Sequence, residues 1–86
     1  MIEIGKFNDF KIRPSKHFIL DYMRKWRWDD YDLKIALEGL YKLEKVGKYK
    51  YEGYTRHGAK GNSRKIIFVA DEEYKEIFII SGAEGK

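Results

Sequence analysis

Two apolar runs near the C-terminal end form the clearest pattern in the chain. Residues 66–69 and 77–80 are uninterrupted apolar segments, and the acidic segment 71–73 between them favours a solvated turn. Because strand side chains alternate between two faces, a continuous apolar run predicts a strand that is covered on both faces. A short buried helix would show the same run, but β-branched and aromatic enrichment favours strands. The pattern predicts a hairpin over residues 64–82 as the centre of the fold.

Apolar residues that precede this hairpin follow a helical period in two segments. The first predicted helix runs from about Lys16 to Trp26, after a Ser15 cap. Its predicted buried stripe has spacings of i, i+1, i+4, i+5 and i+8 and contains Phe18, Ile19, Tyr22, Met23 and Trp26. The second helix covers about Tyr31 to Leu40, and either Asp29 or Asp30 can cap it. Its predicted stripe contains Leu33, Ala36, Leu37 and Leu40.

Shorter segments on either side of the helices predict further strands. A strand over about Phe10 to Arg13 is the preferred interpretation of the N-terminal part. After the helices, Leu43 and Val46 belong to one candidate strand and Lys48 to His57 form the next. Gly47 supplies the turn or bulge between them. The sequence therefore predicts an α+β fold in which two helices cover one sheet face.

Length and composition restrict the class of protein. Eighty-six residues supply one core, so 1–86 is expected to be a single domain, with 82–86 as a loose tail. The absence of cysteine excludes disulfides, cysteine-ligated zinc, iron-sulfur clusters and thiol nucleophiles. The net charge of +4 permits an anionic partner, although many ordinary soluble domains reach this value.

The same composition bears on location and source. No apolar run approaches the roughly 20 residues that span a bilayer, and the N-terminal residues lack the pattern of a signal peptide. We therefore expect a cytoplasmic protein without a membrane partner. The lack of glutamine and the abundance of lysine, glutamate and isoleucine resemble the composition of thermophile proteins.

Positive charge is concentrated in the connection that leads into the central hairpin. Two glycines lie among the basic residues Arg56, His57, Lys60, Arg64 and Lys65. Glycine lets backbone amides approach a phosphate, and the cations supply the attraction that dominates nucleic-acid affinity. Tyr54 offers a stacking face for an unpaired base. With Lys48 and Lys50 from the preceding strand, these residues are the RNA-binding candidates; the alternative is an ordinary solvated loop.

His57 is the preferred catalytic candidate because the surrounding cations favour the neutral imidazole, which can accept a proton. RNA cleavage by its own 2′-hydroxyl needs a base for that hydroxyl, cations for the phosphate charge and an acid for the leaving oxygen. His57 can act as the base, with Arg56, Arg64 or Lys65 as electrostatic stabilisers. The alternative is a surface histidine without a role.

A second candidate site lies on the first predicted helix. His17, Asp21 and Arg24 have i, i+4 and i+7 spacing, so the carboxylate can lie between imidazole and guanidinium. Helical surfaces also produce such pairs without a function. Two histidines without a third nearby ligand argue against a metal site, and no serine has the surroundings of a hydrolase nucleophile. We therefore expect no metal and no cofactor.

Trp26 and Trp28 lie at the junction between the predicted helices. Trp26 belongs to the buried stripe of the first helix. Trp28 is either a core residue, which is the preferred interpretation, or an exposed anchor for a partner.

The order of these segments resembles a family of small domains similar to the RelE-like and BrnT-like ribonuclease toxins. The resemblance covers about Phe10 to Ser81 and is carried by Ser15-Lys16-His17, Asp32-Leu33 with Ala36-Leu37, Gly47 to Tyr54 and Arg64 to Val69. The chain departs from the pattern at Asp21 and Tyr22, where an arginine is usual, and the stretch to Asp32 carries an extra residue.

The resemblance implies a RelE-like α+β fold, with two N-terminal helices packed on a curved antiparallel sheet of about four strands. It also implies RNA at the basic side of the sheet and an antitoxin protein as partner. Toxins of this kind share no single catalytic set, so the resemblance assigns no catalytic residue. The sequence thus predicts a ribonuclease-toxin-like domain; the alternative is a non-catalytic protein- or RNA-interaction module that could form a homodimer.

Overall fold

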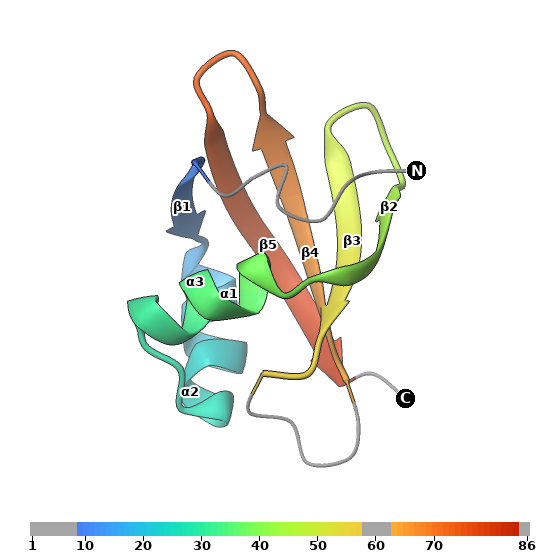
Figure 1. Cartoon of the computed structure of the whole chain (residues 1–86). Coiled ribbons are helices and arrows are strands. Elements are labelled where there is room, and N and C mark those ends of the chain that lie inside the picture. The colour runs from blue at the N-terminus through green and yellow to red at the C-terminus, as the bar shows by residue number, and fades with distance from the viewer. Residues whose placement is uncertain (1–8, 58–62, 85–86) are drawn as a thin grey trace.

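The computed structural model describes residues 9–57 and 63–84, which form a helical layer packed on one mixed sheet (Figure 1). In chain order the elements are β1 (Lys11–Pro14), α1 (Lys16–Phe18), η1 (Ile19–Met23), α2 (Arg24–Trp26), α3 (Asp30–Glu38), β2 (Tyr41–Lys45), β3 (Lys50–Thr55), β4 (Arg64–Asp71) and β5 (Glu76–Glu84). The α+β class predicted from the sequence is confirmed. No helix among the described residues is long and apolar enough to cross a membrane.

The segments α1, η1 and α2 follow one another without a break and together cover the first predicted helix. The Ser15 hydroxyl caps it by accepting a hydrogen bond from the Phe18 amide at 3.0 Å. The same hydroxyl donates to the Ile80 carbonyl oxygen at 3.1 Å. One side chain therefore both starts the helix and ties it to β5.

The middle of this helix is a π turn, in which the Arg24 amide donates to the Ile19 carbonyl. A π turn is wider than an α turn, so it rotates the residues that follow relative to a regular stripe. Phe18, Met23 and Trp26 are buried as predicted, but Ile19 is 41% exposed. The prediction that Ile19 belongs to the buried stripe is wrong.

Helix α3 begins with a reciprocal capping box. Asp29 Oδ1 accepts a hydrogen bond from the Asp32 amide, and Asp32 Oδ2 accepts one from the Asp29 amide, both at 2.9 Å. Of the two predicted caps, Asp29 is therefore the one used. The helix ends at Glu38, before the predicted boundary at Leu40, although Leu40 is still buried.

The sheet has five strands in the order β1-β5-β4-β3-β2, rather than about four antiparallel strands. β1 pairs with β5 in parallel, whereas the other neighbouring strands are antiparallel. The Lys11 amide donates to the Lys75 carbonyl at 2.7 Å, and the Ser15 amide donates to the Ile79 carbonyl at 2.9 Å. This pairing joins residues more than 60 positions apart, so no local pattern could predict it.

Three strand boundaries differ from the sequence predictions. Val46 lies beyond the end of β2, and β3 is shorter than the predicted strand from Lys48 to His57. Residues 82–84 belong to β5 and pair with residues 64–66, so the prediction of a loose tail is wrong for them. Residues 85 and 86 lie outside the described part of the chain.

Gly82 allows close contact between β5 and the first helix. A Cβ atom at this position would lie 3.0 Å from Trp26 Cη2 and 3.2 Å from Phe18 Cε1. Any side chain would therefore push the two aromatic rings away from the strand.

The core lies between the helices and one face of the sheet. The buried apolar side chains that the strands contribute to this face are Tyr51, Ile66, Phe68, Ala70, Ile77 and Ile79. Ile67, Val69 and Ile80 are only half-buried, and Phe78 is 43% exposed. The prediction that the central strands are covered on both faces is therefore wrong for the second face.

Candidate functional site

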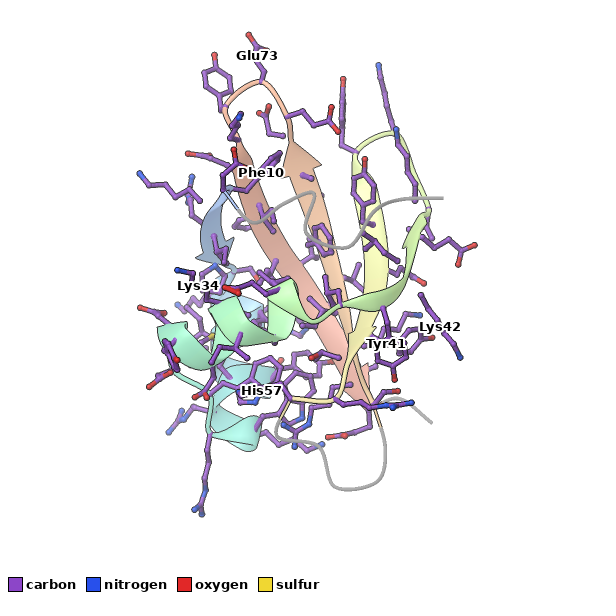
Figure 2. The ribbon with its side chains drawn as sticks, viewed as in Figure 1. Phe10, Lys34, Tyr41, Lys42, His57 and Glu73 are labelled. Atoms are coloured by element: carbon purple, nitrogen blue, oxygen red, sulfur yellow. The ribbon has the colours of Figure 1, made fainter. Side chains whose placement is uncertain are left out.

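His57 follows the end of β3 and lies close to the start of α3 (Figure 2). Its Nε2 atom is 2.9 Å from Asp32 Oδ1, and its backbone amide donates to Thr55 Oγ1 at 3.2 Å. The imidazole centroid lies 5.6 Å from the centroid of the Trp28 ring system. With 27% of its side chain exposed, His57 remains open to a ligand.

Asp32 is held by two separate contacts. Its Oδ2 atom belongs to the capping box of α3, while its Oδ1 atom contacts His57. The Asp29 backbone amide and then the His57 side chain lower the pKa of the Asp32 carboxyl. The carboxylate therefore stays ionised, and when it accepts the Nε2 proton of His57, Nδ1 is left as a proton acceptor.

Arg64 projects from the start of β4 onto the tryptophan pair. Its Cζ atom lies 4.8 Å from the Trp26 ring centroid and 5.7 Å from that of Trp28. Trp26 Nε1 donates to Glu84 Oε1 at 2.8 Å. In contrast, the buried Nε and Nη1 atoms of Arg64 and the Nε1 atom of Trp28 lack a hydrogen-bond partner in the described residues. All three atoms are donors, and because they are buried, an external acceptor could reach them only if the neighbouring side chains moved.

Three other predicted site residues, Arg56, Tyr54 and Lys65, lie on the side of the sheet that faces away from the helices. Arg56 Cζ lies 5.1 Å from the centroid of the Tyr41 ring, and Tyr41 packs against Tyr54 with a centroid separation of 6.1 Å. Lys65 pairs with Tyr54 across the sheet and forms an ion pair of 3.1 Å with Glu52. Strand alternation places them away from the helices. The structure thus separates them from His57 and Arg64.

Two pKa shifts accompany this second group. The Ser63 side chain and then the Arg56 guanidinium lower the pKa of the Tyr41 phenol. The Glu52 carboxylate raises the pKa of Lys65, which holds the ammonium in its charged form. The charge of Lys65 is thus offset by Glu52, so Lys65 attracts an anion less than the sequence suggested.

Two further RNA-binding candidates, Lys48 and Lys50, lie away from both His57 and Tyr54. Lys50 begins β3 and Thr55 ends it, so Lys50 lies about 17 Å from the His57 end of the strand. Lys48 lies in the turn before β3, where its Nζ atom is 5.4 Å from the Tyr49 ring centroid. Lys60 lies outside the described residues.

The second candidate site forms an exposed pair on the first helix. His17 Nδ1 lies 2.7 Å from Asp21 Oδ2, as the spacing predicts, and both side chains are more than half exposed. In the described parts of the chain, Arg24 forms no ion pair with Asp21. The predicted carboxylate bridge between histidine and arginine is therefore formed on its histidine side alone.

The contact of Asp32 with His57 was not predicted from the sequence. The spacing of Asp29 and Asp32 in the capping box could have shown that this carboxylate is held in place. Nothing local could have shown its contact with a histidine 25 positions away. Trp28 is buried, which confirms its preferred interpretation as a core residue.

Replacing Asp32 with asparagine should make the stability of the fold less sensitive to acid. The pKa of Asp32 is lowered in the folded state, so its contribution is present above the unfolded-state value of about 3.9. That contribution is lost as the pH falls through the lowered folded-state pKa. We expect the free energy of unfolding, measured with urea, to fall less between pH 7 and about pH 2 in the variant than in the wild type.

The matched control for this measurement is Asp30→Asn, which removes an exposed acid from the same helical turn. This control should keep the acid dependence of the wild type. An Asp32→Asn protein with the wild-type dependence would show that the contacts of Asp32 do not form in solution.

The described residues contain no group of three or more histidine and acidic side chains that could hold a metal ion. The described residues instead place two groups with possible chemical roles around the Trp28 ring. One is His57, held by the Asp32 carboxylate, and the other is the Arg64 guanidinium. A scan against protein-family models, a search of curated proteins and a search of solved structures each gave no match to this chain.

Proposed function

We propose that this chain is a ribonuclease-toxin-like RNA-binding domain that cleaves RNA by metal-independent acid/base chemistry. The observation that carries the proposal is the 2.9 Å contact between His57 Nε2 and Asp32 Oδ1 beside Trp28. Arg64 lies against the same ring system, with two buried donors that lack an acceptor in the described structure. A base for the 2′-hydroxyl and a cation for the phosphate charge are two of the three groups that RNA cleavage requires.

In the proposed reaction, His57 Nδ1 removes the proton of a ribose 2′-hydroxyl. The 2′-oxygen attacks the adjacent phosphorus, the bond from phosphorus to the 5′-oxygen breaks, and that oxygen takes a proton from water. The products are a 2′,3′-cyclic phosphate and a 5′-hydroxyl. Asp32 is a positioning residue, which holds the imidazole and stabilises its protonated form.

Arg64 supplies the electrostatic part of the proposal. Its guanidinium is always charged, and a delocalised cation of this kind suits the negative charge of a phosphate. Stacking on Trp26 and Trp28 keeps this cation in place without neutralising its charge. Arg64 is therefore preferred over Lys65 as the group that stabilises negative charge on the phosphate.

The direct test is cleavage of end-labelled RNA in the presence of EDTA. We expect shortened fragments that end in a 2′,3′-cyclic phosphate, and binding that weakens as salt increases. A matched RNA with a 2′-deoxyribose at the cleaved position should stay intact at that position. Fragments that end in a 3′-hydroxyl, or cleavage that EDTA abolishes, would contradict the proposed chemistry.

A second candidate function is a non-catalytic interaction module. The observation that favours it is Phe78, which is 43% exposed on the sheet face that the described helices leave uncovered. An antitoxin or a second copy of the chain could cover this face, together with the half-buried Ile67, Val69 and Ile80. Salt-sensitive RNA binding without cleavage, or no interaction with RNA, would favour the module.

A further inference from the structure

A hollow of about 420 Å³ opens on the side of the sheet away from the helices. Its lining includes Tyr41, Lys42, Tyr54, Ser63 and Lys65. Figure 2 shows Tyr41 and His57 on either side of the end of β3. The hollow is therefore separate from the tryptophan-lined cluster that contains His57 and Arg64.

We infer that this hollow is a subsite for one unpaired nucleobase of a single-stranded RNA. The inference rests on the proposed RNA-binding function and adds the class of RNA that would be bound. The two tyrosine rings supply aromatic surface, and Tyr54 is only half-buried. Bases in a duplex are already stacked and paired, so an aromatic wall of this kind selects an unpaired base.

The polar lining favours a base over a phosphate. A phosphate needs donors and positive charge, whereas one of the two ammonium groups in this lining, that of Lys65, is paired with Glu52. A nucleobase edge presents both donors and acceptors, which the Ser63 hydroxyl and the Lys65 ammonium can match. The aromatic and hydroxyl lining therefore suits a heterocycle.

The position of the hollow also connects it with the proposed cleavage site. Arg56 and His57 are consecutive residues, with Cα atoms about 3.8 Å apart. Their side chains nevertheless lie on opposite sides of the sheet, at the end of β3. Arg56 lies over Tyr41, while His57 contacts Asp32. A single strand that crosses the end of β3 can therefore present a base to the tyrosines and a neighbouring ribose to His57.

The test uses a single-stranded RNA with 2′-O-methyl riboses, which cannot be cleaved, and one 2-aminopurine base as a fluorescent probe. Stacking on a tyrosine should quench the probe when the wild-type protein binds. Tyr54→Leu should weaken binding by about 5- to 150-fold, the range given by alanine substitution at base-stacking positions. Tyr54→Phe keeps the ring and should bind within about twofold of wild type.

Tyr74→Leu is the matched control, because Tyr74 is 72% exposed in the turn between β4 and β5. Tyr41→Leu provides a second variant of the hollow, and near-ultraviolet circular dichroism of each protein verifies its folding. Unchanged affinity in folded Tyr54→Leu and Tyr41→Leu, or equal losses for single-stranded and duplex RNA, would overturn the subsite. Because the probe RNA cannot be cut, the result does not depend on whether the wild-type protein cleaves RNA.

Discussion

Replacing His57 with alanine is expected to lower the rate of RNA cleavage by about 10²- to 10⁴-fold, the usual contribution of a positioned acid or base. The imidazole is the group that would remove the 2′-hydroxyl proton, and Asp32 holds it at 2.9 Å in an orientation that leaves Nδ1 available. The measurement is the single-turnover cleavage rate of end-labelled RNA in EDTA at saturating protein. Saturation separates a loss of chemistry from a loss of binding.

His17→Ala is the matched control, because it removes the chain's other histidine from an exposed helical pair with Asp21. It should keep the wild-type rate if His57 is the base. A large loss in His17→Ala or Arg24→Ala, together with an active His57→Ala protein, would instead identify the helical pair as the reactive site. An active His57→Ala protein would by itself contradict the proposed role of His57.

Replacing Phe68 with alanine is expected to reduce the free energy of unfolding by about 3–5 kcal/mol. Phe68 is 0% exposed at the centre of the sheet and stacks on Tyr51, with ring centroids 5.6 Å apart. Truncation would leave a cavity between the sheet and the helices. Because small domains are stable by only about 5–15 kcal/mol, much of the protein could unfold. Urea denaturation followed by tryptophan fluorescence measures this loss.

Phe78→Ala is the matched control, since it makes the same change on the neighbouring strand but on the opposite face. Phe78 is 43% exposed, so its truncation should cost about 1 kcal/mol or less. Equal losses for the two variants would show that Phe78 is buried in solution. If the loss of unfolding free energy in Phe78→Ala also grew with protein concentration, a second copy of the chain would be covering this face of the sheet.

The helices illustrate how far local patterns lead. Ser15 and Asp29 cap the two helical segments as predicted, because a cap depends on atoms within one turn. The π turn is different, because the extra width between Ile19 and Arg24 has no signal in a period of 3.6 residues. Ile19 was therefore placed in the core although it lies on the surface.

In the candidate site, too, nearness along the chain predicted only part of the arrangement. The sequence predicted His57 and Arg64 as site residues because both lie in one short basic segment. It grouped them with Arg56 and Lys65, which the folded chain directs to the opposite side of the sheet. Nearness along the chain does not determine the side, since neighbouring strand residues point in opposite directions.

The sequence by itself determined the α+β class, the two helical segments and the central hairpin. These features depend on period, capping and composition, which act over a few residues. Only the tertiary structure decided that β1 joins β5 in parallel and that His57 meets Asp32. It also placed the guanidinium of Arg64 against the tryptophans. These contacts join segments far apart in the chain, and they form only when the helices and strands pack together.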